Sequence, residues 1–425
     1  MKKVLILTET AGNGHNSCAR AMKNKLEAMG DIEVKIVDIL KEFSTAWNAW
    51  VVDGGYSFTV SKLPHAYDAF YNMYKKSPPE RRYSNGAQGV VKTTLDGLMK
   101  EILSYQPDVI YCTHYNCAIA LTNLKLVYDL PCKTLVANLD YVNSPFWESA
   151  IGVDYFAIPN EDFIEECKLE GFKEEQLLPI GLPVDDRSLV KLDKAEARKK
   201  LGLEQDKFTI MVMFGGGCWS GGFKIFKWLI SALKGREAQV IMINGKDKAS
   251  YEKIEKMTFE PGIKVLNVGF THDIPVYLSA ADLILNKFGG SSVTEMINAE
   301  LPMLITEQIP AQEKYNLQYM KSKGVALSFK TSKELKQNLH LIMDNESLRN
   351  GMSENTKALK KDALNTLAKF IYDLPNADYS KLIEQGVNLK KVKREVSAAM
   401  RKADKQERAA TRSRRKELKA VGNRG

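Results

Sequence analysis

The stretch ILNKFGGSSVTEMINAELPMLITEQIPAQEKYN, residues 284–316, joins an apolar run to a helical pattern through two glycines and two serines. Gly289 and Gly290 carry no side chain, so the backbone at this turn can come close to a ligand. Ser291 and Ser292 would then open a helix, whose free backbone N–H groups and positive dipole end favour a bound diphosphate. The stretch therefore predicts a buried strand, a phosphate-binding turn and a helix in succession.

A carboxylate and a second polar cluster accompany this turn. Glu295 would lie one helical turn beyond the serines, on their face of the helix, where it could accept hydrogen bonds from ribose hydroxyls. The alternative is a capping box, because SSVTE fits the S-x-x-E pattern from Ser292. Further on, PAQEKYN places Gln312, Glu313 and Asn316 after another strand, where they could bind the hydroxyls of a sugar. The recurrence of polar groups at this distance favours a nucleotide-sugar site over an ordinary loop.

Apolar runs that alternate with glycine turns and helical segments recur along the chain, which is typical of parallel sheets covered by helices on both faces. The pattern begins with KVLILT, residues 3–8, and restarts at FTIMVMFGGG, residues 208–217. This second series offers Gly215 and Gly216 to the same diphosphate. Prolines, glycines and charges at residues 183–193 mark a linker. We predict an α/β chain of two Rossmann-like domains whose parallel sheets face each other across a ligand-binding cleft.

The predicted boundaries follow from that linker and from the charge distribution. The N-terminal domain would comprise residues 1–185, and the C-terminal domain residues 186–375, with its last helix able to pack back on the N-terminal domain. Residues 376–425 would form a basic tail, as an exposed helix or disordered. Residues 390–425 contain 14 Lys/Arg and 4 Asp/Glu, a net charge of +10. The whole chain carries +9, so residues 1–389 together carry a net charge of about −1. Nucleic-acid binding is not expected, because no supporting fold accompanies the tail.

The first glycine turn, TAGNGHNSCARAM, places Gly14 and His15 at the mouth of the first strand–helix connection. A nicotinamide site is not expected there, because the G-x-G-x-x-G pattern is incomplete and only Asp38 stands near the end of the next strand. The positive end of the helix dipole would lower the pKa of His15 and keep it neutral, as a general base requires. The alternative is a histidine that only caps the turn. Asp140, after another strand, is the second catalytic candidate, either to orient His15 or to act as the base itself.

Residues 43–83 contain ten aromatic side chains. One interpretation is a helical pair that packs on the sheet. The other is a surface that meets lipid headgroups, because Trp and Tyr favour the boundary between water and an apolar phase, and lysines and arginines stand nearby. The candidates for this surface are Trp47, Trp50, Tyr67, Phe70 and Tyr71.

Several classes of protein are not expected. No window approaches 18 consecutive apolar residues, so a transmembrane helix is not predicted, and the first apolar run is shorter than the core of a signal peptide. Six cysteines without paired close spacing, apart from CTHYNC at residues 112–117, are typical of reduced thiols in a cytoplasm. No second pair completes a zinc set, so we predict no metal site there. A bound cofactor is not expected either.

At these motifs the chain resembles the two-domain glycosyltransferases that make glycosyl-diacylglycerols, namely the bacterial processive diacylglycerol glucosyltransferases and the plant monogalactosyldiacylglycerol synthases. The resemblance covers residues 2–372 and rests on GNGH, LDYVNSPFW, GLPV, GFTHDIPVYLSAADLILNKFGGSSVTEM and PAQEKYN. The sequence departs from the family patterns at Phe288 and Ala311, where proline and glycine are usual, and at residues 143–145, where a histidine is usual.

This resemblance implies a GT-B fold and the inverting, metal-independent transfer of a hexose, glucose or galactose, from a UDP-sugar to diacylglycerol or a glycosyl-diacylglycerol. It implies that the N-terminal domain binds the acceptor beside His15, that the C-terminal domain binds the donor, and that Phe270 joins the donor residues. The implied location is cytoplasmic and peripheral, on the anionic inner face of the cell membrane. The alternatives are a peptidoglycan-precursor N-acetylglucosaminyltransferase, a UDP-sugar 2-epimerase and a non-catalytic UDP-sugar sensor.

Overall fold

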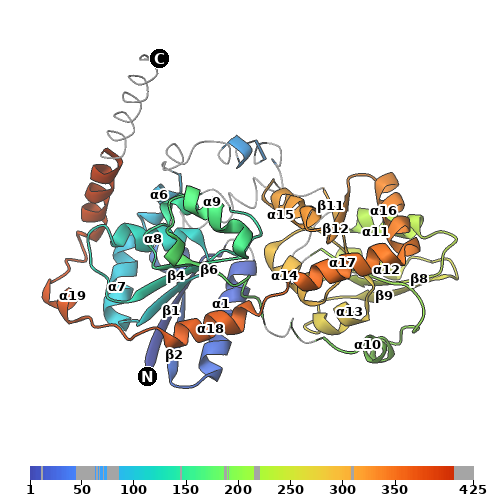
Figure 1. Cartoon of the computed structure of the whole chain (residues 1–425), viewed down its shortest axis with the longest axis horizontal. Coiled ribbons are helices and arrows are strands. Elements are labelled where there is room, and N and C mark those ends of the chain that lie inside the picture. Colours follow the sequence, from blue (N-terminus) through green and yellow to red (C-terminus); the bar gives the residue numbers. More distant parts are fainter. Residues whose placement is uncertain are drawn as a thin grey trace, which may run out of the picture.

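Two parallel β-sheets of six strands each form the two lobes of the computed structural model (Figure 1). Helices cover both faces of each sheet, as the continuous apolar strands require. The two lobes confirm the α/β class and the predicted pair of Rossmann-like domains. The structure describes residues 1–10, 13–44, 63, 66, 68–69, 71–73, 86–143, 146–185, 189, 191–214, 221–307 and 311–405.

The N-terminal sheet has the strand order β2-β1-β3-β4-β5-β6. Alternate residues of its first strand are buried in different layers. Val4 and Ile6 pack with helices α1 (Asn13–Ala28) and α18 (Ala363–Asp373), whereas Leu5 and Leu7 pack with α7 (Leu95–Tyr105) and α8 (Tyr115–Leu124). The strands are β1 (Lys2–Thr8), β2 (Ile32–Asp38), β3 (Val109–Cys112), β4 (Lys133–Ala137), β5 (Tyr155–Ile158) and β6 (Leu177–Pro179), and the main helices are α1 (Asn13–Ala28), α2 (Ile39–Phe43), α6 (Gly86–Val91), α7 (Leu95–Tyr105), α8 (Tyr115–Leu124) and α9 (Ile164–Leu169).

The C-terminal sheet has the order β12-β11-β10-β7-β8-β9, and every residue of β7, β8, β10 and β11 is buried. Its strands are β7 (Thr209–Met213), β8 (Ala238–Ile243), β9 (Ile263–Val268), β10 (Leu283–Asn286), β11 (Met303–Thr306) and β12 (Ala326–Phe329). Its helices are α10 (Lys194–Lys200), α11 (Gly222–Ala232), α12 (Lys248–Glu255), α13 (Ile274–Ala280), α14 (Gly290–Asn298), α15 (Ala311–Ser322), α16 (Ser332–Asp344) and α17 (Glu346–Ala358).

Each sheet has a point where the direction of chain progression reverses, and ligands of open α/β sheets bind there, outside the carboxyl ends of the strands. In the N-terminal sheet the point lies between β1 and β3. In the C-terminal sheet it lies between β7 and β10, so the chain leaves these two strands, at Phe214 and at residues 287–289, on one edge. The topology alone therefore brings together motifs that are far apart in sequence.

The chain passes between the lobes twice, and the two connections touch. The first follows β6, and the second lies between α17 and α18 (Ala363–Asp373), which packs on α1 of the N-terminal domain (Figure 1). Gly181 of the first connection adopts a φ of +99°, and a Cβ atom there would lie 2.7 Å from the Cβ of Lys361 in the second. Only glycine allows this close approach.

Beyond α18 the chain continues along the N-terminal domain through α19 (Ser380–Glu384) to a helix at residues 392–405. Val392, Val396 and Met400 on one face of this helix are buried in the N-terminal core. The hydroxyl of Tyr128 donates to the Glu395 carboxylate at 2.7 Å. The described part of the basic segment is therefore a docked helix, in contrast to the exposed or disordered tail that its composition predicted. No helix among the described residues is both long and apolar enough to span a bilayer.

Candidate active site

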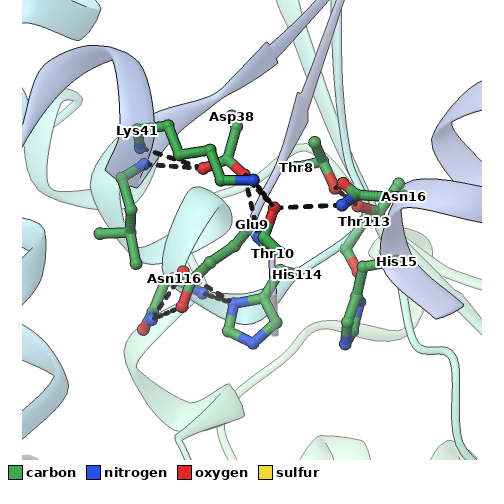
Figure 2. Close-up of polar contacts among 11 residues, drawn as sticks. Thr8, Glu9, Thr10, His15, Asn16, Asp38, Lys41, Thr113, His114 and Asn116 are labelled. Atoms are coloured by element: carbon green, nitrogen blue, oxygen red, sulfur yellow. Dashed lines mark hydrogen bonds and ion pairs between the residues drawn. The ribbon is translucent and has the colours of Figure 1, made fainter. Parts of the chain in front are cut away.

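The turn after β1 is held by a network of short polar side chains (Figure 2). Asp38, at the end of β2, caps α2 and accepts hydrogen bonds from the backbone N–H of Thr10 at 3.0 Å and from its hydroxyl. Lys41 and Asn16 both donate to the Thr10 hydroxyl, at 2.7 and 3.1 Å. The hydroxyl of Thr8 donates to the Asn16 side chain at 3.0 Å. These contacts fix the path of the chain into α1 and with it the position of His15.

His15 lies in the first turn of α1, and its Nδ1 atom is 2.5 Å from the carbonyl oxygen of Thr113, which follows β3. A carbonyl oxygen only accepts, so Nδ1 carries the hydrogen and Nε2 keeps its lone pair. Burial, reinforced by the nearby His114, lowers the pKa of His15 to about 4. The ring is therefore neutral near pH 7, as the sequence predicted, although the main cause is desolvation rather than the helix dipole.

A second histidine stands beside the first, and sequence reasoning missed it. The rings of His15 and His114 meet edge to face with their centroids 4.7 Å apart. His114 Nδ1 lies 3.2 Å from a carboxylate oxygen of Glu9, and Asn116 donates to both oxygens of that carboxylate, at 3.1 and 2.9 Å. The CTHYNC motif, which contains His114, suggests by its spacing only a metal site. The sequence does contain one indication of the pair, because Glu9 and His114 each stand just after a predicted strand and the two strands are neighbours in the sheet.

The low pKa of His15 gives a testable prediction. The folded protein resists protonation of this ring more than the unfolded chain does, so the contribution of His15 to folding stability falls as the pH decreases from about 6.5 toward 4. An NMR titration of the ring should show a midpoint near pH 4, and a His15→Gln variant should lose that resonance alone. A midpoint near the ordinary value of 6.5 would contradict this account of the site.

In the C-terminal domain, α14 begins at Gly290, and its N-cap is Gly289, without a side-chain capping bond. Ser292 is therefore inside the helix, and the capping-box alternative is wrong. The two glycines serve different purposes. A Cβ at Gly289 would meet nothing within 4 Å, which leaves space in front of the helix, whereas a Cβ at Gly290 would lie 1.8 Å from the carbonyl oxygen of Leu139 in the N-terminal domain. Gly290 is one of the places where the two domains touch.

The PAQEKYN cluster faces the same edge. Glu313 and Asn316 lie in α15, and Lys287 pairs with Glu313 at 3.1 Å. Burial raises the pKa of Glu313, with a further contribution from Asp140, while Lys287 opposes the rise. One oxygen of Glu313 and the side-chain oxygen of Asn316 are buried without a hydrogen-bond partner among the described residues. Buried polar atoms are normally paired, so these two acceptors fit hydroxyl groups of a ligand.

Asp140 belongs to the contact between the domains. Its carboxylate accepts a hydrogen bond from the Asn316 amide at 3.0 Å. The hydroxyls of Tyr141 and Thr294 meet 3.2 Å apart across the same boundary. Of the two catalytic candidates, His15 therefore contacts the residue that follows β3, whereas Asp140 is hydrogen-bonded to Asn316 of α15.

The remaining predicted residues are placed as follows. Gly14 lies with His15 in the first turn of α1, Ser291 and Glu295 lie in α14, and Gln312 is in the first turn of α15. Phe270, between β9 and α13, is 56% exposed and makes an edge-to-face contact with His272. Tyr71 is only 6% exposed and packs against Tyr315, so it does not face a membrane. Outside the described residues lie Gly215, Gly216, Trp47, Trp50, Tyr67 and Phe70.

Comparison with protein families gives two matches that together span both lobes. Residues 15–184 match the monogalactosyldiacylglycerol (MGDG) synthase family, and residues 210–367 match the glycosyltransferase family 28 C-terminal domain. Among curated proteins, the chain is 27% identical to monogalactosyldiacylglycerol synthase 2 of Arabidopsis thaliana, over 78% of this chain and 72% of that protein. It is 26% identical to the processive diacylglycerol β-glucosyltransferase of Bacillus licheniformis, over 84% and 91% of the two chains.

Solved structures share the fold. MurG of Acinetobacter baumannii superposes with a TM-score of 0.61 and 12% identity, over 88% of this chain and 99% of that one. The UDP complex of Staphylococcus aureus MnaA gives a TM-score of 0.57 and 14% identity, over 91% and 98%. At these identities the likeness shows the arrangement of the two domains, which is GT-B.

Proposed function

The chain is a GT-B glycosyltransferase, related through both of its domains to enzymes that glycosylate diacylglycerol, and we propose that it moves a hexose from a UDP-sugar to diacylglycerol or a glycosyl-diacylglycerol. The proposed transfer inverts the anomeric carbon and requires neither a metal nor a cofactor. The observation that carries the proposal is the pair of buried acceptors, Glu313 and Asn316, at the edge where the glycine turn of α14 opens. Sugar hydroxyls and a diphosphate are the ligand groups that suit these two features together.

On the donor side, we assign the diphosphate to the N-terminus of α14 and the ribose to Glu295. The open space in front of Gly289 admits the phosphates close to the backbone. As the glycosidic bond breaks, negative charge grows on the leaving UDP, and backbone N–H groups already oriented at the helix end stabilise it without reorganising. Ser291 and Ser292 lie in the first turn of the same helix.

On the acceptor side, the lipid hydroxyl would approach beside His15, opposite the donor. The contacts of Asp140 and Tyr141 with α15 and α14 hold the two domains together, so acceptor and donor would meet in a fixed orientation. Because diacylglycerol resides in a bilayer, the enzyme would work on the cytoplasmic, anionic surface of the membrane. The basic segment of residues 390–425, with 14 Lys/Arg, would add attraction on the order of 1 kcal/mol for each cation near that surface.

The decisive experiment supplies donor and acceptor separately. We expect the purified protein, mixed with anionic vesicles that contain diacylglycerol, to form a glycolipid with one of UDP-glucose, UDP-galactose or UDP-N-acetylglucosamine in the absence of divalent metal. Glu295→Ala should raise the KM for the donor by about 10- to 100-fold, the effect of losing hydrogen bonds to a charged group. His15→Ala should lower kcat instead. UDP release without a glycolipid would keep the donor site and reject the lipid acceptor, and no turnover with any donor would favour a UDP-sugar sensor.

A further inference from the structure

His15 and His114 differ in the groups that support their rings. Both rings lie at the reversal point between β1 and β3, with their unbonded ends on the same side, away from the strands (Figure 2). His15 rests on a neutral carbonyl group, and its partner His114 rests on a carboxylate. A carboxylate stabilises the imidazolium that forms when a ring accepts a proton, and a carbonyl does so much less.

The Glu9 carboxylate is buried and ionised. Its side chain is 1% exposed, yet the pKa of Glu9 is lowered, because His114 and Asn116 outweigh the cost of burial. The Nδ1 atom of His114 has two polar neighbours: the Glu9 carboxylate, which only accepts hydrogen bonds, and the backbone N–H of Asn116, 3.2 Å away, which only donates. In the tautomer that carries its hydrogen on Nδ1, that hydrogen faces Glu9. The Nε2 atom then holds the lone pair, and among the described residues it has no hydrogen-bond partner.

We propose that Glu9 and His114 form the carboxylate–histidine pair that removes the proton from the acceptor hydroxyl, while neutral His15 orients that hydroxyl. This assignment rests on the proposed function. His114 Nε2 takes the proton, and the hydroxyl oxygen uses its electron pair to bond the anomeric carbon. The bond from that carbon to the diphosphate breaks with its electrons on UDP, and the imidazolium later releases its proton to water. Glu9 acts through His114 and is a positioning residue.

The ring of His114 contacts titratable side chains from three elements. Among the described residues, the titratable groups that face it are Glu9 from the turn after β1, His15 from α1, and Tyr115 from its own helix, whose ring centroid is 4.1 Å away. Glu9 is ionised near pH 7 and His15 is neutral there, because the pKa of each is lowered. Removal of the Glu9 charge should therefore move the acid limb of the rate profile.

The test compares Glu9→Gln, His114→Ala and the wild-type protein in the vesicle assay. Glutamine keeps the shape of Glu9, but its amide can donate to Nδ1 and favour the wrong tautomer. We expect both variants to lose about 10²- to 10⁴-fold in kcat, with the donor KM and UDP binding unchanged. Added imidazole should partly restore His114→Ala, and the acid limb of Glu9→Gln should shift to lower pH. His340→Ala, in α16, is the matched control and should respond to neither treatment.

Two results would overturn the assignment. The first is a kcat within about threefold of wild type in both variants, since a general base contributes at least about a hundredfold. The second is a loss of kcat that is accompanied by an equal loss of UDP binding or of thermal stability, without rescue by imidazole and without a shift of the acid limb. That result would show that Glu9 and His114 have only a structural role. The proposed function fails separately, when the wild type forms no glycolipid. In that case ¹⁵N NMR still decides the tautomer, because an Nε2–H tautomer of His114 in the wild type would contradict the pair.

Discussion

Gly290→Ala is expected to lower kcat/KM by at least about a hundredfold, the cost of misplacing reacting groups by roughly 1 Å. The added Cβ would lie 1.8 Å from the carbonyl oxygen of Leu139 and 3.1 Å from the Asp140 carboxylate. A backbone carbonyl cannot move aside as a flexible side chain can, so the domains must separate. Steady-state kinetics would measure the loss, and small-angle X-ray scattering should show a larger radius of gyration.

Two other glycines serve as comparisons for this variant. Gly351→Ala, on the exposed face of α17, meets nothing within 4 Å and should leave kinetics and dimensions unchanged. Gly289→Ala also meets nothing, and its φ of −132° suits any residue, so the domains should stay together while the KM for the donor rises. Wild-type kcat/KM in Gly290→Ala would refute the idea that this contact sets the geometry of the cleft.

Asp282→Ala is expected to destabilise the C-terminal domain by about 3–5 kcal/mol, the cost of leaving a buried charge without its partner. Arg198 is buried, and its guanidinium donates to the Asp282 carboxylate at 2.6 Å. The same carboxylate accepts from the backbone N–H of Thr209 at the start of β7 and from Lys194, both at 2.8 Å. Urea unfolding followed by circular dichroism would measure the loss.

The matched control for this variant is a surface pair of the same kind. Arg236 and Asp344 form a two-pronged ion pair, but Asp344 is exposed to solvent, so Asp344→Ala should hardly change the unfolding midpoint. The double variant Asp282→Ala/Arg198→Met should recover part of the stability, because the unpaired charge is gone. Equal midpoints for Asp282→Ala and Asp344→Ala would show that the buried pair does not stabilise the domain.

The sequence was sufficient for the two sheets and the glycine turns because these depend on local patterns, namely continuous apolar strands and residues without side chains. It was not sufficient for the pairing of Glu9 with His114, since the two residues are 105 positions apart and only the adjacency of β1 and β3 brings them together. The docked C-terminal helix left a weak signal, because Val392, Val396 and Met400 recur every four residues among charged neighbours. Gly290 was correctly selected, but its contact with Leu139 depends on the position of a whole domain.

The two chain connections that touch at Gly181 and Lys361 determine how the lobes can move. If a single connection joined the domains, they could rotate about several axes, so that they could twist as well as open. When two connections lie side by side, the domains can rotate easily relative to each other about one axis only, the line that passes through both connections. A rotation about that line would carry Gly290 away from Leu139 and return it along the same path. The crossing of the two connections thus determines where the N-terminus of α14 meets the N-terminal domain.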